Sequence, residues 1–211
     1  MNALEKSLLS LGYSFDKIEK NIFLVNNFLN DSEVISVMNQ IGESSEKDWE
    51  KHYMDGVADL AERKYGRRDI ENLLEEELIE ITYHWVDKNL GLNFETSETL
   101  SARIQKIFSF DKNLIFDGAG TIQRQYSGAQ LTEHVDNHAD PLIEYAVIMY
   151  VNDDYTEGEL FFSNLGIEIK PAARSLIIFP SGEDYLHGVK APGEGPLRYV
   201  LPSFVRKAGS A

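Results

Sequence analysis

The sequence predicts an α+β fold, with helices of the N-terminal half packed on one sheet of a jelly-roll core, also called a double-stranded β-helix. Two observations predict this arrangement. Residues 1–110 carry mainly helical patterns of apolar residues, whereas residues 113–206 consist of short β-rich runs separated by loops rich in Gly, Pro, Asp and Asn. No repeat, low-complexity segment or linker divides the chain, so residues 1–211 are expected to form a single domain.

The N-terminal half is expected to contain one strand-then-helix unit and three further helices. A β-rich run followed by a cap at Asn30, Asp31 or Ser32 predicts the strand and helix within 21–41. A fourth helix, over 96–108, is expected after Thr96 or Ser97. The two helices between them are predicted from apolar residues near helical spacing. They carry Trp49, Tyr53, Val57, Leu60 and Ala61 in one case, and Ile70, Leu73, Leu74, Leu78, Ile81 and Trp85 after a cap at Asp69 in the other.

The C-terminal half is expected to supply eight short strands. Each run is rich in β-branched and aromatic residues and ends at turn residues, which is the pattern of a double-sheet barrel. The runs are LIFDGAGTIQRQY, the stretch around His134, YAVIMYVN, ELFFS, GIEIK, SLIIFP, LHGV and LRYVLPSFVR.

Composition excludes several classes of function. The formal net charge is −15, from 20 basic and 35 acidic residues, so we expect neither nucleic acid nor a membrane as a partner. The basic cluster RKYGRR is interpreted as solvated helix surface, because the acidic run ENLLEEELIE follows shortly after it. Cysteine is absent, which rules out a thiolate site and suits a reducing compartment. The N-terminus lacks the layout of a signal peptide, and the expected location is cytoplasmic.

The stretch EHVDNH is a candidate half of a metal site. On a strand, residues i and i+2 project from one face, so His134 and Asp136 would point the same way. Together they offer two ligands of a 2-His-1-carboxylate triad, which is typical of non-haem Fe(II) oxygenases. His187, in the run YLHGV, is the best third ligand because it also lies in the β half. His138 is expected to lie in a surface or lid position, since its offset turns it away from His134.

Arg198 strengthens this interpretation, because it follows His187 by eleven residues on the last predicted strand. A guanidinium that points into an apolar barrel needs an anion, and its planar fork suits a carboxylate. HxD alone, or an arginine alone, would more often be an ordinary surface feature.

In combination these motifs resemble the Fe(II)/2-oxoglutarate-dependent dioxygenases, in particular the prolyl 4-hydroxylase-like branch. The resemblance is carried by QYSGAQLTEHVDN, MYVNDDYTEGELFF and LHGVKAPGEGPLRYVLPSF, and by FLVNNFLNDSEV near the N-terminus. HVDN followed by an arginine looks most like the oxygen-sensing prolyl hydroxylases. The match covers roughly half of the chain.

The resemblance implies three iron ligands and three residues that contact 2-oxoglutarate. The iron ligands would be His134, Asp136 and His187. The contacts to 2-oxoglutarate would be Arg198, which pairs with the distal carboxylate, and the hydroxyls of Tyr126 and Tyr150. It also implies O2 as a cosubstrate and allows ascorbate as a reductant.

The surroundings of the site can be assigned in outline. Asn137 is a candidate partner for the ligand imidazoles, and residues 137–144 and 111–121 are candidate lid loops. An apolar surround that excludes water is expected from Ile122, Ile148, Leu160, Ile178 and Val200.

The expected activity is hydroxylation of a prolyl residue in a protein or peptide, with succinate and CO2 as coproducts. Three positions depart from the prolyl hydroxylase pattern: Ile143 replaces an arginine, Ala146 a threonine and Phe204 a tryptophan. The alternatives are therefore the same chemistry on a free amino acid or other small molecule, and a metal-binding jelly-roll module without turnover.

Overall fold

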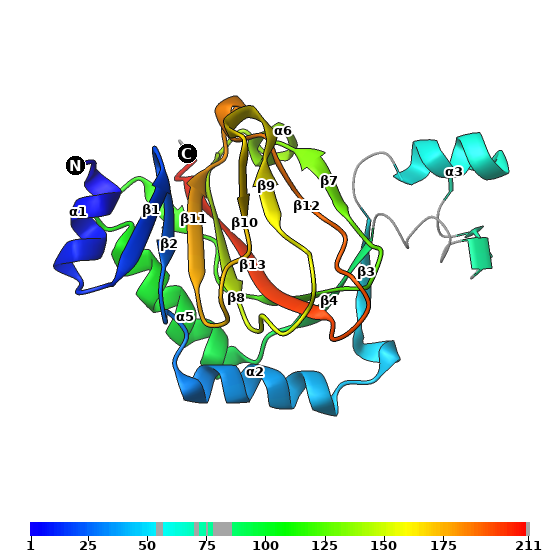
Figure 1. The fold of residues 1–211 in the computed structure, drawn as a ribbon, viewed down its shortest axis with the longest axis horizontal. Coiled ribbons are helices and arrows are strands. Elements are labelled where there is room, and N and C mark those ends of the chain that lie inside the picture. Colours follow the sequence, from blue (N-terminus) through cyan, green and yellow to red (C-terminus); the bar gives the residue numbers. More distant parts are fainter. Residues whose placement is uncertain (54–56, 70–71, 75, 78–85, 210–211) are drawn as a thin grey trace.

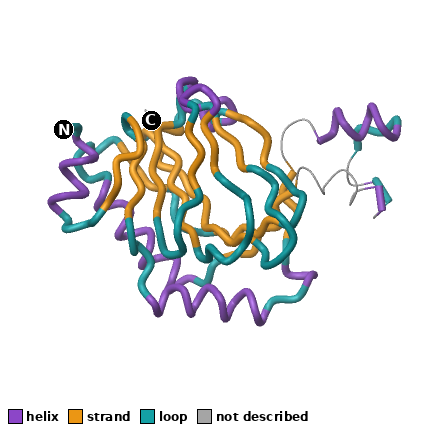
Figure 2. Tube along the Cα trace, in the orientation of Figure 1, coloured by secondary structure: helices purple, strands orange, loops and turns teal. Residues whose placement is uncertain are grey.

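The computed structural model describes residues 1–53, 57–69, 72–74, 76–77 and 86–209. Two antiparallel sheets form the centre, and the helices lie around them (Figures 1 and 2). The helices are α1 (Ala3–Ser10), α2 (Asp31–Glu43), α3 (Val57–Tyr65), α5 (Phe94–Ile107) and α6 (Asp136–Ala139), with short 3₁₀ turns at Glu46–Asp48, Ser163–Leu165 and Glu183–Tyr185. Among the described residues, no helix is both long and apolar enough to span a membrane.

The larger sheet, called the major sheet below, has the strand order β1-β2-β11-β8-β13-β6-β4-β3, and β5 also pairs with β13. The smaller sheet, called the minor sheet, has the order β10-β9-β12-β7. The major sheet consists of β1 (Phe15–Glu19), β2 (Ile22–Val25), β3 (Glu50–Tyr53), β4 (Val86–Gly91), β5 (Leu114–Phe116), β6 (Thr121–Gln125), β8 (Ile143–Tyr150), β11 (Leu176–Pro180) and β13 (Arg198–Lys207). The minor sheet consists of β7 (Leu131–His134), β9 (Leu160–Phe162), β10 (Ile167–Ile169) and β12 (His187–Val189). The predicted jelly-roll core with helices on one sheet is thus confirmed.

The major sheet is buried on both faces, and each face has its own apolar core. Leu176 and Ile178 of β11 join the core that the major sheet shares with α1, α2 and α5. The alternate residues Ile177 and Phe179 join the core between the two sheets. A strand buried on both sides needs apolar residues at every position, which explains the unbroken run LIIF.

The expectation of a mainly helical N-terminal half was only partly right. The strand-then-helix unit is present as β2 and α2, and α5 begins after the cap Asn93, three residues before the expected Thr96. However, β1 to β4 all belong to the major sheet, and Trp49 lies directly before β3 rather than on a helix. Pairing of β3 with β4, and of β4 with β6, overrides the local helical spacing. The helix expected after Asp69 falls largely outside the described residues.

Helices α2 and α5 are joined by a largely buried ion pair. Arg103 Nη1 donates to both carboxylate oxygens of Glu33, at 2.8 and 3.0 Å, and Nη2 donates to the Phe28 carbonyl at 2.6 Å. Glu33 is 6% exposed, and its other role is to close the capping box with Asn30 at the start of α2. One arginine therefore fixes both the helix cap and the helix pair.

Arg103→Ala is expected to lower the free energy of unfolding by about 2–3 kcal/mol, because it leaves the Glu33 carboxylate buried without its cation. Chemical denaturation followed by circular dichroism measures this loss. Arg68→Ala is the matched control, since Arg68 pairs with Glu62 at the surface, and its effect should stay within about 0.5 kcal/mol. Equal effects of the two substitutions would contradict the structural role given to Arg103.

Candidate metal and cosubstrate site

Two histidines face each other across neighbouring strands of the minor sheet. β7 ends at His134, β12 begins at His187, and the two residues are direct partners in the antiparallel register. Their ring centroids lie 4.4 Å apart. Strand pairing thus joins two residues that are 53 positions apart in the sequence, and both belong to the predicted set.

Asp136 completes the cluster, although the local structure differs from the expected continuous strand. The strand ends at His134, and Asp136 is the first residue of the short helix α6. Val135 between them is extended, with φ −122° and ψ 120°, so the two side chains still project to the same side. Nε2 of His134 lies 3.4 Å from Oδ1 of Asp136, and Nε2 of His187 lies 3.8 Å from Oδ2. The three ligand atoms lie within 4.8 Å of one another.

Backbone carbonyls orient both imidazoles. The Thr132 carbonyl oxygen lies 2.8 Å from Nδ1 of His134, and the Tyr185 carbonyl oxygen lies 3.0 Å from Nδ1 of His187. A carbonyl can only accept, so each Nδ1 carries a proton, which leaves Nε2, on the side of Asp136, as the nitrogen that can bind a metal. These carbonyls do what was expected of Asn137, and they fix the tautomer that a metal ligand requires.

The electrostatics of the cluster favour a cation. Burial lowers the pKa of His187, even though the Asp136 carboxylate raises it, so the imidazole tends to stay neutral. Asp136 is 7% exposed, and its buried Oδ2 has no hydrogen-bond partner among the described residues. A buried carboxylate oxygen of this kind is costly unless a cation or donor satisfies it. Two imidazoles and one carboxylate are the donor set of a facial Fe(II) site, which the residues therefore fit.

Gly188 allows the strands that carry the histidines to approach closely. A Cβ at this position would lie 2.8 Å from the Leu131 carbonyl oxygen on β7 and 2.8 Å from Cζ of Phe161. The backbone oxygen cannot rotate away, so β12 would have to move relative to β7.

Gly188→Ala is expected to weaken Fe(II) binding by about tenfold or more, because it separates His187 from His134, and to cost about 1–3 kcal/mol of stability. Iron titration and thermal unfolding measure the two effects. Gly182→Ala is the control, because a Cβ there meets no atom within 4 Å. An alanine at 188 that leaves iron affinity unchanged would show that the close approach is not needed for the site.

Arg198 lies on the opposite sheet from the histidines, at the first position of β13. It is 3% exposed, and its Nη2 donates to the Tyr150 hydroxyl at 3.1 Å, while Nη1 donates to Oε1 of Gln125, also at 3.1 Å. Gln125 donates in turn to the Ala129 carbonyl at 2.6 Å. Two neutral oxygens thus orient this buried guanidinium, whose planar fork is suited to a carboxylate.

The structure brings Arg198 and Tyr150 together but gives Tyr126 a different contact. Tyr126 follows β6, and its ring packs with the Arg124 guanidinium at 5.2 Å. In the register of β6 with β13, Gln125 is the residue opposite Arg198. The sequence analysis did not identify Gln125, because the resemblance implied the neighbouring Tyr126 hydroxyl as the contact to 2-oxoglutarate. The pattern TIQRQ could have revealed it, because Gln123 and Gln125 lie on one face of the strand and Ile122 lies on the other.

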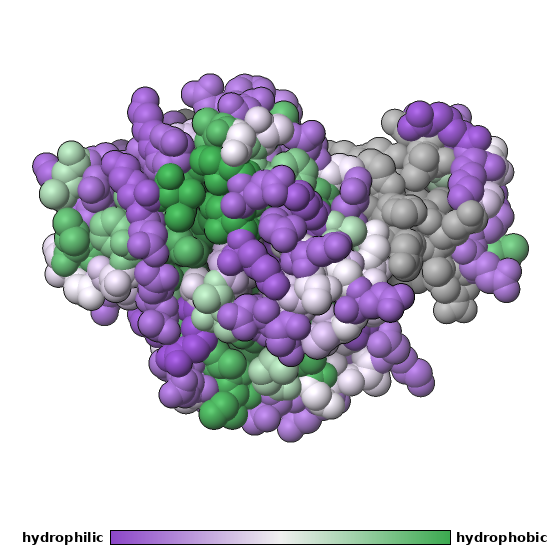
Figure 3. All heavy atoms as spheres, in the orientation of Figure 1, coloured by the Kyte–Doolittle hydropathy of each residue, from purple (hydrophilic) through white to green (hydrophobic). Residues whose placement is uncertain are grey.

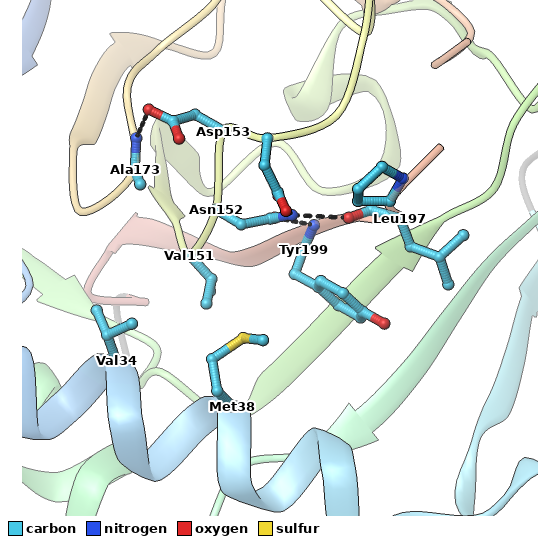
Figure 4. A pocket seen from close by; sticks show the side chains of 10 residues that line it. Val34, Met38, Val151, Asn152, Asp153, Ala173, Leu197 and Tyr199 are labelled. Atoms are coloured by element: carbon cyan, nitrogen blue, oxygen red, sulfur yellow. Dashed lines mark hydrogen bonds between the residues drawn. The ribbon is translucent and has the colours of Figure 1, made fainter. Parts of the chain in front are cut away.

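Asn152, at the end of YVN, fixes the start of β13 on both sides of Arg198. Its Nδ2 donates to the Leu197 carbonyl at 2.8 Å, and its Oδ1 accepts from the Tyr199 amide at 2.8 Å. These bonds lie in a groove of about 480 Å³ beside α2, on the outside of the barrel (Figure 4). The groove is therefore not part of the metal site. The Asn152 hydrogen bonds that line it hold the backbone on both sides of Arg198 from the outside of the barrel.

The expected apolar surround is correct at three positions and wrong at two. Ile148, Leu160 and Val200 face the core between the sheets, close to the site. Ile122 and Ile178 face the helices on the other side of the major sheet. Because both faces are buried, hydrophobicity alone did not reveal which residue of each strand points inward. Phe162 and Phe179 pack against His187 instead, with ring centroids at 5.8 and 4.7 Å.

The two candidate lid loops are joined through β13. Arg206 contacts Asp117 in one loop and Asp140 in the other. His138, also in the second loop, is exposed and contacts Glu183 rather than the three-residue cluster. Its placement agrees with the expected surface position.

Comparisons with known proteins agree with this site. Residues 121–206 match the family model described as the 2OG-Fe(II) oxygenase superfamily, a segment that contains the three cluster residues and Arg198. The resemblance seen in the sequence is therefore confirmed over this segment, and together with the three-residue cluster it leads us to expect Fe(II), 2-oxoglutarate and O2 as cofactors. No curated protein matches the sequence significantly.

Solved structures share the fold at low sequence identity. A prolyl hydroxylase from Trichoplax adhaerens, in complex with a hypoxia inducible factor peptide fragment, has a TM-score of 0.64 and 17% identity, covering 97% of this chain and 90% of that chain. The viral collagen prolyl hydroxylase of Paramecium Bursaria Chlorella virus-1 has a TM-score of 0.60 and 15% identity, covering 90% and 97%. A Pseudomonas putida prolyl-4-hydroxylase has a TM-score of 0.51 and 21% identity, covering 83% and 100%.

Proposed function

We propose that this chain is a 2-oxoglutarate-dependent dioxygenase that hydroxylates a prolyl residue in a protein or peptide, since its residues 121–206 match the family model of the 2OG-Fe(II) oxygenase superfamily. Succinate and CO2 are the coproducts. The observation that carries the proposal is the cluster of His134, Asp136 and His187 on one side of the barrel, with Arg198 on the other.

In this proposal His134, Asp136 and His187 hold Fe(II). Its support is the donor set, the tautomers fixed by two backbone carbonyls, and the buried Asp136 oxygen without a hydrogen-bond partner. Bound together, Fe(II) and 2-oxoglutarate supply the activation of O2 and the hydroxylation of the substrate. The protein's part is to hold the ligands in place, orient both imidazoles through the backbone carbonyls and exclude water.

Arg198 and Tyr150 bind the distal carboxylate of 2-oxoglutarate in this proposal, with Tyr126 as a further contact. The Tyr150 hydroxyl accepts from Arg198, so its own proton remains available for an anion. Leu160 and Val200, from opposite sheets, form the apolar walls of the cosubstrate pocket. Ascorbate would serve as reductant. A cytoplasmic location is part of the proposal, because a chain without cysteine needs no oxidising compartment.

The proposal includes the whole of residues 1–211 as one oxygenase domain. Its support is that β2 pairs with β11 and β4 pairs with β6, so strands from the first 110 residues extend the sheet that carries Arg198.

The three positions that depart from the prolyl hydroxylase pattern, Ile143, Ala146 and Phe204, are all apolar, which supports an uncharged ring as the substrate group. Ala146 is paired with both Phe179 and Phe204 in the major sheet, and Phe179 packs against His187. A free amino acid would need partners for its ammonium and carboxylate. The nearby cations Arg206 and Lys207 are already engaged by acidic residues of this chain. An uncharged aliphatic ring needs no such partner.

A peptide and metabolite array, scored for a mass gain of one oxygen, tests the substrate. We expect modified peptides to contain proline and to lose the gain when proline is replaced by alanine. A gain confined to free amino acids or other small molecules would favour the first alternative. No oxygen gain and no Fe(II)-dependent turnover of 2-oxoglutarate would favour a binding module.

A further inference from the structure

Tyr155 lies beside the arginine of the proposed cosubstrate site and has not been assigned a role so far. Tyr155 is 1% exposed, and its buried hydroxyl has no acceptor for its proton among the described residues. Tyr150, the other tyrosine at this site, is fully buried and bonded to Arg198. Two buried phenols therefore lie at one guanidinium, which can only donate to them, and the proton of the Tyr155 hydroxyl has no acceptor among the described residues.

Gly158 explains how the Tyr155 ring reaches this position. It adopts φ +71°, a backbone conformation that favours glycine, and a Cβ there would lie 3.1 Å from Cε2 of Tyr155 and 3.5 Å from Cδ of Arg198. The ring and the arginine stem thus pack against the same backbone position. Lys170 also packs against the Tyr155 ring, with its Nζ 4.7 Å from the ring centroid.

The Tyr155 hydroxyl is a donor at neutral pH. Burial raises the pKa of Tyr155 to about 12, against the opposing effects of the Arg198 charge and of a contact in which Arg198 is the donor. A buried O–H group without an acceptor costs free energy, because its proton has lost its bond to water and made none in the protein. An acceptor that enters beside Arg198 would remove this cost.

We propose that Tyr155 is a third donor to the distal carboxylate of 2-oxoglutarate, together with Arg198 and Tyr150. The assignment rests on the proposed function of this site. A carboxylate has about four lone-pair positions, so it can accept from a guanidinium and from two phenols at once. Gln125 and Tyr150 accept from the two terminal nitrogens of Arg198, which orients the fork before the ligand binds.

Tyr155→Phe tests the assignment, because it removes only the oxygen atom. Calorimetric titration of Mn(II)-loaded protein with 2-oxoglutarate should give an affinity about tenfold weaker than that of the unchanged protein. Titration with 2-oxopentanoate, which has the same chain without the distal carboxylate, should show no change. The melting temperature without ligand should stay equal or rise, since a buried hydroxyl without an acceptor has been removed.

Tyr145→Phe is the matched control. Tyr145 lies on β8 like Tyr150, but it packs against Phe108 in the core shared with the helices, with ring centroids at 5.2 Å. Removing the Tyr145 hydroxyl should leave the affinities for 2-oxoglutarate and for 2-oxopentanoate unchanged.

Two results would overturn the assignment. One is an unchanged affinity for 2-oxoglutarate in Tyr155→Phe, and the other is an equal loss for 2-oxoglutarate and 2-oxopentanoate, which would indicate a packing role. Failure of the unchanged Mn(II)-loaded protein to bind 2-oxoglutarate is a different result. It would contradict the proposed function itself.

Discussion

Replacing His187 with alanine is expected to abolish retention of Fe(II). The substitution removes one of only three proposed protein ligands and leaves Asp136 and His134 with the metal. Loss of a group that merely orients a ligand commonly weakens metal binding 10–100-fold, so loss of a ligand should exceed about 100-fold. Iron content after anaerobic loading and desalting measures the Fe(II) retention of the variant directly, and circular dichroism checks that the barrel still folds.

His138→Ala is the control for this experiment. His138 lies four residues after His134, is exposed, and contacts Glu183 at the surface. The variant His138→Ala should retain iron at the level of the unchanged protein. Iron content in His187→Ala equal to that of His138→Ala would remove His187 from the site.

Arg198→Ala is expected to weaken 2-oxoglutarate binding by about 100-fold or more. The buried guanidinium would provide the charge that compensates a desolvated carboxylate, and losing one partner of such a pair commonly costs about 3–5 kcal/mol. Calorimetric titration of Mn(II)-loaded protein measures the effect.

The graded variant Arg198→Lys should fall between alanine and arginine, because lysine keeps the charge but loses the planar fork. Affinity for 2-oxopentanoate should be nearly unaffected in both variants. If both ligands lost affinity equally, the arginine would support the fold of the pocket and not the distal carboxylate.

Much of the site could be predicted from the types of its residues and from their order in the sequence. His134, Asp136, His187 and Arg198 are rare side chains in β-rich surroundings, and strand alternation relates the first two. The structure then adds the cross-strand pairing of the two histidines, which no local pattern contains.

The inward-facing residues of the major sheet could not be predicted with the same success. The run LIIF of β11 has no polar side to set its phase, so Ile178 looked as suitable as Ile148. In β6 the polar Gln125 faces Arg198 and Ile122 faces the helices, which is the reverse of the usual pattern. The phase depends on pairing with distant strands. The resemblance directed attention to Tyr126, whereas the residue opposite Arg198 in the strand register is Gln125.

The N-terminal half was predicted least well, and the cause is again long-range pairing. Trp49 fits a helical spacing, yet its ring packs against Arg124 of β6, at 4.1 Å, and β3 follows it directly. By contrast, α2 was predicted correctly because Asn30 and Glu33 form a local capping box. Figure 3 shows why its hydrophobicity was a weaker guide: apolar groups gather on the outer surface over α2, where Ile35 and Met38 are exposed.

The most direct test of the central claim is release of succinate from 2-oxoglutarate by the purified protein, with Fe(II) and O2 and without added substrate. A 2-oxoglutarate oxygenase should show slow uncoupled turnover that requires Fe(II). The turnover should vanish in His187→Ala and persist in His138→Ala. Absence of succinate under all conditions, or release that is equal in the two variants, would contradict the assignment of this cluster as the oxygenase site.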